Sequence, residues 1–239
     1  MDFTGKLVVI TGVGRAGQVG EAVALGFAQR GATLALLDMQ QAEVDARADV
    51  LRADGHIVSA HSANLSDAAA AKAVAEQVIA AHPDCRGAVH AMVHVAGGFG
   101  ATGPLDVSDP EAWHKQFMIN LDTAYGATRA FLPALRLGRG ALVYFGSVAA
   151  LPGGSPRGIA AYAAAKSAVL TLMRAVAAEE WGNGVRANAV APTQIRTAAN
   201  MTSMKADTEY VERESVADVV AFLASAAARN ITGQVITLA

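Results

Sequence analysis

The chain has one cysteine, few aromatic residues and no excess of charge of either sign. Cys85 has no partner for an internal disulfide, and a single thiol cannot build a multi-cysteine metal site. Lysine and arginine number 19 against 21 aspartates and glutamates, which gives a formal charge of -2 without a basic cluster. Nucleic acids and anionic membranes both attract concentrated positive charge. We therefore expect neither as a partner.

Long apolar runs are also missing. No run approaches the roughly 18 residues that a membrane-spanning helix needs, and Met1 to Lys6 lack the charged-then-apolar layout of a secretory signal. These absences favour a cytoplasmic protein. No ligand spacing typical of a metal site occurs, so no metal is expected.

Apolar residues make up 53% of the 239 residues, and charged residues 17%. This composition supplies ample material for a buried core and gives little sign of disorder. No repeat, low-complexity tract or linker divides the chain. We expect a single domain over residues 1–239.

Short apolar runs alternate with longer helical patterns along the whole chain. Several runs are apolar at consecutive positions, as in strands covered on both faces. Strands are expected at Leu7–Thr11, Thr33–Asp38, Ile57–Ala60, Ala88–Val95, Ala141–Phe145, Val185–Val190 and Val235–Leu238. Helices are expected at Gly20–Arg30, Gln41–Ala53, Asp67–Ala81, Pro110–Leu135, Ala160–Trp181 and Val216–Ala227. The alternation predicts an α/β fold, a doubly wound parallel sheet of the Rossmann type with about seven strands and helices on both faces.

Four glycines stand in the ten residues TGVGRAGQVG that follow the first strand. Gly12, Gly14 and Gly17 form a G-x-G-x-x-G, whereas Gly12, Gly17 and Gly20 give a looser spacing in which the helix begins later. Both interpretations indicate a phosphate ligand, because the first strand-to-helix turn of such a sheet faces the ligand crevice and offers free N–H groups.

Asp38 strengthens this interpretation. It ends the second strand in TLALLD, 18 residues after Gly20, where a carboxylate can accept hydrogen bonds from an adenosine ribose. The alternative is a cap for the following helix. With the glycine turn and the acid in register, we favour dinucleotide binding.

A second informative region contains Ser147, Tyr162 and Lys166. The tyrosine and the lysine are four residues apart and therefore share a helix face. The serine ends a strand 15 positions before the tyrosine, at the edge of the same crevice. A strand-end serine followed by a glycine-rich loop and Y-x-x-x-K, downstream of a dinucleotide turn, is a specific combination.

From about Lys6 to Leu238 the chain resembles the short-chain dehydrogenase/reductase family, classical type. The family turn T-G-x-x-x-G-x-G corresponds to Thr11, Gly12, Gly17 and Gly20 with two extra residues, which we expect to widen the loop without removing its phosphate-facing N–H groups. The active-site tetrad of the family is similar to Asn120, Ser147, Tyr162 and Lys166. The family's nicotinamide loop P-G-x-x-x-T is matched at Pro192, Ile195 and Thr197, with Thr193 in place of the glycine.

Other positions depart from the family pattern. The usual N-N-A-G reads His94-Val95-Ala96-Gly97, and we expect His94 to be a buried structural residue rather than a catalytic one. The aspartate that contacts adenine appears as Asn64, and the glycine pair and tail after the last strand are absent. These departures affect cofactor fit and assembly and leave the tetrad whole.

The resemblance implies a nicotinamide cofactor, NAD in preference to NADP, because Asp38 would repel a 2′-phosphate. Arg15 would partly offset that repulsion. The cofactor contacts implied by the resemblance are Gly12, Gly14, Arg15, Gly17, Val19, Gly20, Asp38, Asn64, Leu65, Ala96, Gly97, Tyr162, Lys166, Ile195 and Thr197.

The implied reaction transfers a hydride between nicotinamide and a secondary alcohol or ketone, a small-molecule substrate. Tyr162 would be the acid–base, with its pKa brought toward neutrality by the Lys166 ammonium and the oxidised nicotinamide. Ser147 would hold the substrate oxygen and Asn120 a proton-relaying water. The alternatives are a dinucleotide-binding regulator without turnover, and a nucleotide-sugar epimerase or dehydratase, which usually has a longer C-terminal region.

The resemblance also implies a homodimer or homotetramer formed through the helices at Ala160–Trp181 and Pro110–Leu135. Residues 198–215 form a short substrate lid without a strong apolar stripe, so we expect it to pack loosely and leave an open pocket. Met201 and Met204 would contact substrate; the alternative is that both pack beneath the lid into the core.

Overall fold

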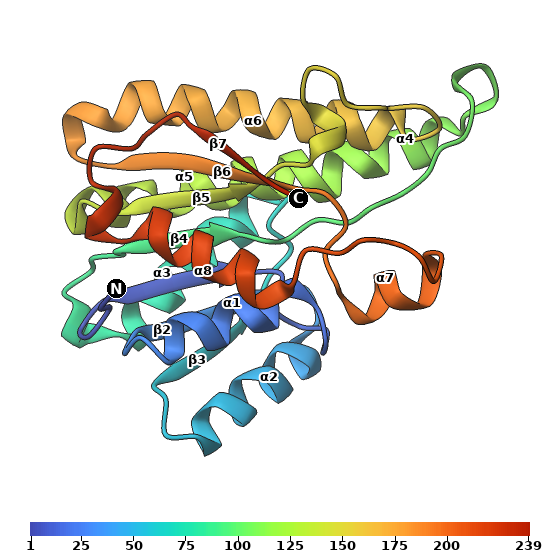
Figure 1. The fold of residues 1–239 in the computed structure, drawn as a ribbon. Coiled ribbons are helices and arrows are strands. Elements are labelled where there is room, and N and C mark those ends of the chain that lie inside the picture. Colours follow the sequence, from blue (N-terminus) through green and yellow to red (C-terminus); the bar gives the residue numbers. More distant parts are fainter.

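A computed structural model describes residues 1–239, and a parallel sheet of seven strands runs through its centre (Figure 1). The strand order is β3-β2-β1-β4-β5-β6-β7, and every neighbouring pair is parallel. The doubly wound Rossmann-type prediction is therefore confirmed. The strands are β1 Leu7–Thr11, β2 Thr33–Asp38, β3 Val58–Ser62, β4 Ala91–His94, β5 Ala141–Phe145, β6 Arg186–Pro192 and β7 Val235–Leu238.

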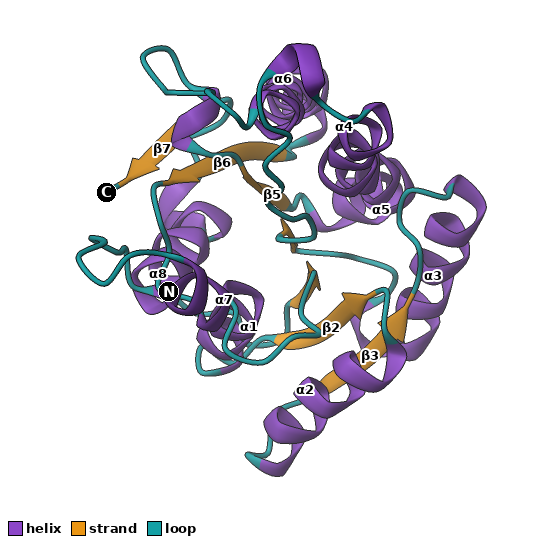
Figure 2. Cartoon of the chain, turned by 90° about the vertical axis from the view of Figure 1, so that its right-hand side faces the viewer, coloured by secondary structure: helices purple, strands orange, loops and turns teal.

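Helices cover both faces of the sheet (Figure 2). On one face lie α1, α2 and α8; on the other lie α3, α5 and α6, with α4 against α6. The bounds are α1 Val19–Ala28, α2 Gln41–Ala53, α3 Ala68–Ala81, α4 Pro110–Phe117, α5 Thr123–Gly138, α6 Ala160–Glu180, α7 Ala198–Ser203 and α8 Arg213–Ala224. The short α7 stands beyond the carboxyl ends of the strands, at the right of Figure 1. None of these helices combines the length and apolarity that crossing a bilayer requires.

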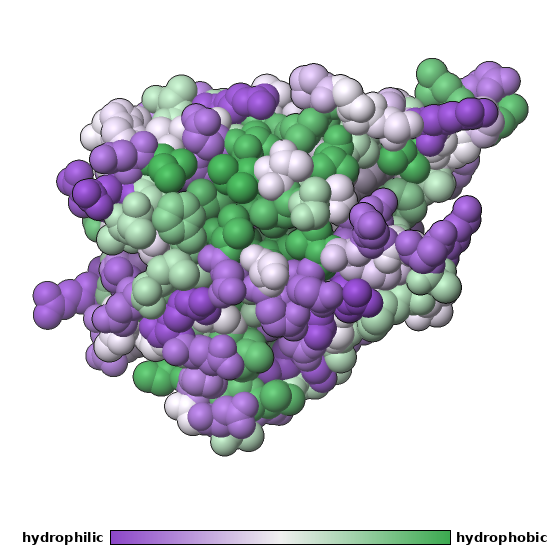
Figure 3. Space-filling view, viewed as in Figure 1, coloured by the Kyte–Doolittle hydropathy of each residue, from purple (hydrophilic) through white to green (hydrophobic).

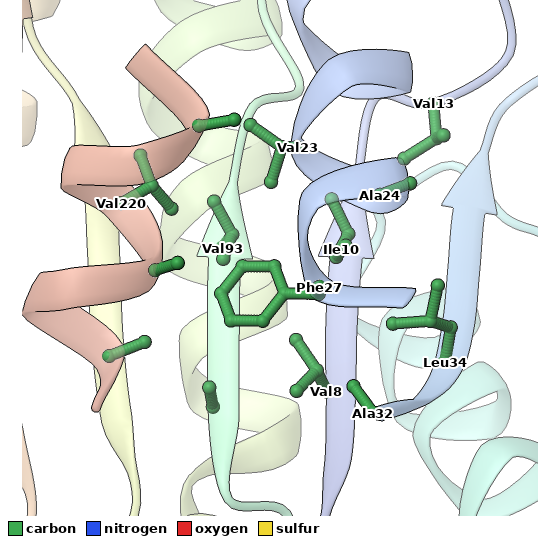
Figure 4. Packing of buried hydrophobic residues seen from close by; sticks show 14 of the residues in the cluster. Val8, Ile10, Val13, Val23, Ala24, Phe27, Ala32, Leu34, Val93 and Val220 are labelled. Carbon is green, nitrogen blue, oxygen red and sulfur yellow. The ribbon is translucent and has the colours of Figure 1, made fainter. Parts of the chain in front are cut away.

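The sheet separates two apolar clusters of similar size, 29 and 26 buried residues. In the first, Phe27 of α1 lies over Val8 and Val93 of neighbouring strands, beside Val220 of α8 (Figure 4). Since both faces are covered, successive residues of a central strand are all buried. This explains the consecutive apolar runs in the sequence.

Three strands differ from the predicted bounds. β6 runs over Arg186–Pro192, because its pairing with β7 continues to Pro192. β3 begins at Val58 and extends to Ser62, because its backbone still pairs with Asp38 of β2 although its side chains are polar. β4 is only four residues long, since the Val89 N–H donates to Ala134 of α5 rather than to a neighbouring strand.

The predicted helix over 110–135 is wrong as a single element. A π-helical turn at Met118–Asp122 separates α4 from α5, and α5 continues to Gly138 despite Pro133 within it. One extra residue per turn preserves the helical appearance of the sequence, so periodicity does not reveal the interruption. Such turns are frequent at functional sites, and this one contains Asn120.

Candidate active site

The glycines of the first turn are required by the chain's own backbone. At Gly12, where φ is +76°, a Cβ would lie 2.6 Å from the Ala96 nitrogen in the segment after β4. A Cβ at Gly20 would collide with the Gly12 carbonyl. Glycine at both positions therefore lets α1 start directly against the end of the sheet.

The N-terminus of α1 is free to bind an anion. Gln18, at the N-cap position, makes no side-chain bond to the first turn of the helix, so the initial N–H groups have no intrahelical or capping partner. Two N–H groups of the turn are already engaged, however: Gly14 donates to Asp38 at 2.7 Å and Gly17 donates to Glu21 at 2.7 Å. The expectation that the extra residues leave the phosphate-facing N–H groups free is wrong for these two.

Two carboxylates meet at Gly14. A Cβ at Gly14 would lie 2.8 Å from the Asp38 carboxyl carbon and 3.0 Å from a Glu43 oxygen. The other Asp38 oxygen accepts from the Met39 N–H at 2.8 Å, while Gln40 occupies the N-cap position of α2. Asp38 is therefore not the helix cap, and this end of the crevice is acidic.

The segment after β3 lies at the same edge of the sheet. The Asn64 side chain closes a local turn by accepting from the N–H of Ser66 at 3.2 Å and from its hydroxyl at 2.7 Å. Leu65 is buried, and its carbonyl lies against Gly126 of α5. Of these two predicted contacts, only Asn64 has an exposed side chain.

Three of the tetrad residues meet where β5 ends. Ser147 lies two residues after the strand, and its hydroxyl is close enough to the Tyr162 hydroxyl to lower the pKa of the tyrosine. The Lys166 ammonium donates to the carbonyl of Phe145 at 2.9 Å and lies 5.9 Å from the centre of the Tyr162 ring. Helix α6 thus directs the side chains of Tyr162 and Lys166 to the end of one strand.

Asn120 reaches the same place from the π turn. Its Oδ1 accepts from the Gly98 N–H at 3.2 Å, and its Nδ2 donates to the Gly98 carbonyl at 3.0 Å. A Cβ at Gly97 would lie 2.6 Å from the Asn120 Oδ1 and 3.5 Å from the Lys166 Nζ. Gly97 therefore allows the asparagine and the lysine to approach each other, and the four predicted side chains share one site.

Burial dominates the electrostatics of this site. It lowers the pKa of Lys166 to about 8, because a desolvated ammonium is disfavoured. Burial also raises the pKa of Tyr162, and the neighbouring Ser147 hydroxyl offsets that rise only in part. The expectation that the Lys166 ammonium and an oxidised nicotinamide together lower the tyrosine pKa stays a prediction, since in the chain itself the ammonium bonds to Phe145 and burial dominates at Tyr162.

His94 is buried, as expected. Its Nε2 is hydrogen-bonded to Thr128 at 3.1 Å, and its ring stacks on Tyr144 at 4.7 Å between centroids. Burial lowers the pKa of His94 to about 3, so the ring is neutral at physiological pH. These contacts belong to the interior packing of β4, β5 and α5.

One pocket joins the start of α1 to the tyrosine and lysine and to the loop after β6. Several of its lining residues were not expected from the sequence, among them Phe99 and Asn200. Phe99 is 66% exposed and meets the Tyr162 ring edge-on at 5.2 Å; its position as the one aromatic residue among glycines was the available signal. The lining residues are Val19, Val95, Gly97, Gly98, Phe99, Phe145, Gly146, Tyr162, Lys166, Pro192, Thr193, Ile195 and Asn200.

The lid contains one short helix, α7, capped by Thr197, whose hydroxyl accepts from the Asn200 N–H at 3.2 Å. Ile195 forms an isolated parallel bridge with Val211 at the far end of the lid. Met201 and Met204 are 54% and 36% exposed, so the alternative that both pack into the core is wrong. In the described chain, no group of three or more His, Cys, Asp or Glu side chains could hold a metal ion.

Comparison with known proteins agrees with this geometry. A family model described as enoyl-(acyl carrier protein) reductase matches residues 12–238. The chain is 34% identical to 2-(S)-hydroxypropyl-CoM dehydrogenase 3 of Xanthobacter autotrophicus, over 95% of this chain and 92% of that protein. It is also 34% identical to meso-2,3-butanediol dehydrogenase of Serratia marcescens, over 98% and 92%.

Among solved structures, a short-chain type dehydrogenase/reductase from Mycobacterium ulcerans superposes with a TM-score of 0.89 at 28% identity, covering 99% of this chain and 89% of that one. The chain belongs to the short-chain dehydrogenase/reductase family of oxidoreductases. The two curated relatives are alcohol dehydrogenases by name.

Proposed function

We propose that this protein is an NAD-dependent dehydrogenase or ketoreductase acting on secondary alcohols and ketones. The observation that carries the proposal is the convergence of Asn120, Ser147, Tyr162 and Lys166 around Gly97 and the end of β5. The names of the relatives support the substrate class, and the geometry supports the assignment of these four residues to the active site.

The residues present fit a dinucleotide. The uncapped start of α1 would hold the pyrophosphate, and Asp38 the adenosine ribose. Lys166 and Tyr162 would hold the nicotinamide ribose, with Ile195 beside the nicotinamide. Thr197, the cap of α7, is a further proposed contact. A bound nicotinamide supplies the acceptor or donor of hydride. Asn64, Leu65, Ala96 and the glycines of the turn complete the proposed contacts.

Tyr162 moves the proton at the substrate oxygen. In oxidation the Tyr162 phenolate would take the proton of the alcohol, and in reduction the Tyr162 hydroxyl would donate a proton to the substrate oxygen. Ser147 hydrogen-bonds the same substrate oxygen and stabilises the charge that develops on it. Burial raises the pKa of Tyr162 and Ser147 offsets that rise only in part, so the positive charge of an oxidised nicotinamide would further favour the phenolate.

We infer NAD as the preferred form from the two carboxylates at Gly14. A 2′-phosphate would bring about two negative charges toward Asp38 and Glu43. Arg15 is exposed and carries the one positive charge within the turn. Its single positive charge does not offset the two negative charges of Asp38 and Glu43.

We also infer self-association. Met118 and Tyr125, near the start of α5, are 44% and 51% exposed, and β7 is an end strand with one unpaired edge. Figure 3 shows apolar side chains gathered on the face that contains this strand. Both features favour pairing with a second copy of the chain.

The proposal is tested by incubating the purified protein with NAD or NADP and a panel of secondary alcohols, then with the reduced cofactors and the matching ketones. Reduced nicotinamide is followed by its absorbance. Turnover of at least one alcohol with NAD supports the proposal. Binding of NAD without turnover across the panel would instead favour a dinucleotide-binding regulator.

A further inference from the structure

Glu21, in the first turn of α1, joins three segments around the glycine turn. Its Oε2 accepts from the Gly17 N–H at 2.7 Å and lies 3.6 Å from Arg213 Nη1 at the start of α8. Its Oε1 is 2.8 Å from Nη1 of Arg47 on α2. These side chains are between 22% and 34% exposed, so the ion pairs are partly shielded from solvent.

Both ends of the lid are fastened to this same place. At the first end, the Ala198 N–H donates to the Gly17 carbonyl at 3.0 Å. Near the other end, Arg213, the first residue of α8, pairs with Glu21. Gly17 itself has a φ of +69°, and a Cβ there would lie 2.9 Å from the Ala198 Cβ. The glycine turn and the lid therefore form one connected unit.

Because the glycine turn is long, the contacts that Glu21 and Ala198 make with it matter for its order. The turn is two residues longer than the pattern it resembles, and a longer loop loses more conformational entropy when it is ordered. Asp38 holds the turn at Gly14, while Glu21 and Ala198 hold it on the two sides of Gly17. Without Glu21, the segment between Gly14 and the start of α1 would keep only the lid contact.

We propose that Glu21 is a positioning residue that fixes the glycine turn for the pyrophosphate and couples the turn to the lid. The consequence for affinity rests on the proposed dinucleotide binding; the coupling of turn and lid does not. Glu21 contacts no reacting atom in this account. It acts through Gly17 and Arg213.

Whether NAD binds more weakly or more tightly after Glu21 is removed distinguishes a positioning role from a purely electrostatic one. Glu21 places a negative charge beside the proposed pyrophosphate site, so its removal would strengthen anion binding if charge alone mattered. If Glu21 positions the turn, its removal weakens binding, because the turn must then be ordered when the cofactor binds.

A second ion pair between the same regions provides a matched control. Arg30, just after α1, pairs with Asp218 of α8 at 2.5 Å, and the aspartate side chain is 64% exposed. This pair touches neither the glycine turn nor the lid. Asp218→Asn therefore removes a link between the regions without disturbing the proposed cofactor site.

The first experiment measures the Kd of NAD by calorimetry. Glu21→Ala should raise the Kd at least tenfold, whereas Asp218→Asn should change it less than twofold. Glu21→Gln should fall between them, because its amide oxygen still accepts from Gly17 while both ion pairs are lost; it also serves if the alanine variant folds poorly. An unchanged or lower Kd in both Glu21 variants would overturn the proposal.

The second experiment measures hydrogen exchange in the protein without cofactor. Glu21→Gln and Arg213→Met should speed exchange across 198–212 relative to Asp218→Asn, and Glu21→Ala should also expose the Gly17 amide. Exchange in these segments equal to that of the Asp218 variant would refute the coupling. If the wild type binds no dinucleotide, the proposed function fails, and the exchange result still decides whether Glu21 holds the turn and lid together.

Discussion

The Lys166 ammonium lies 5.9 Å from the centre of the Tyr162 ring and donates to the Phe145 carbonyl at 2.9 Å. No carboxylate pairs with it, and the residue is only 7% exposed. Keeping an unpaired ammonium in the interior destabilises the fold. Such a placement is typical of a functional site rather than of core packing.

Replacing this lysine with an apolar residue of similar length should stabilise the protein. Lowering the pKa from 10.5 to about 8 corresponds to roughly 3 kcal/mol, and loss of the Phe145 hydrogen bond returns about 1 kcal/mol. Lys166→Met should therefore raise the free energy of unfolding at pH 7 by about 2 kcal/mol while abolishing activity. Urea unfolding measures the change.

The stability gained by Lys166→Met should depend on pH. The folded-state pKa of Lys166 lies below its unfolded value, so the destabilisation is complete below about pH 8 and fades as the pH rises toward 10.5. The advantage of Lys166→Met should fade in the same range. Lys72→Met, at an exposed site on α3, should show no such trend. A Lys166 variant less stable than wild type at pH 7 would contradict the account.

Cofactor preference should depend on both acids at Gly14. We expect kcat/KM with NAD to exceed that with NADP at least tenfold. Asp38→Asn should narrow the ratio, and adding Glu43→Gln should narrow it further, because each removes one charge facing the 2′-phosphate. A wild-type protein that favours NADP would refute the assignment.

The tip of the lid should be mobile, although its two ends are held. Residues 201–207 are all exposed, so their amides should exchange rapidly without ligand and slow when NAD and substrate are present. Met201→Ala and Met204→Ala should lower kcat/KM several-fold for bulky ketones and little for small ones. Strong protection without ligand, together with activity confined to the smallest ketones, would be evidence against an open pocket.

Light scattering at micromolar protein concentration should give at least a dimer mass. The exposed Met118 and Tyr125 make the region around α5 the expected contact. Tyr125→Glu should shift the equilibrium toward monomer, since it places a charge in that contact. A monomeric wild type would reject self-association at this concentration.

The sequence predicted the layered fold because strand burial on both faces leaves an unambiguous apolar run. Spacing and the strand end predicted that Ser147, Tyr162 and Lys166 meet, and the family resemblance added Asn120. The sequence did not predict the π turn at Asn120, since one extra residue leaves helical periodicity nearly unchanged. Polar β3 was misplaced because an edge strand is defined by backbone pairing rather than by apolar side chains.

Contacts that depend on tertiary placement were also missed. Glu21 and Arg213 are almost two hundred positions apart, and nothing local marks them as partners. The pKa of Tyr162 was expected to fall through the Lys166 ammonium together with an oxidised nicotinamide. The lysine instead bonds to Phe145, and desolvation outweighs the other protein groups at Tyr162.

The most direct test compares wild type with Tyr162→Phe on the best alcohol found in the panel. The phenylalanine keeps the ring contact with Phe99 and removes only the hydroxyl. The account predicts that kcat falls at least a hundredfold while the Kd of NAD changes less than threefold, with Tyr125→Phe as the matched control. A Tyr162→Phe enzyme that retains near-wild-type kcat would contradict the central claim that this hydroxyl carries the proton.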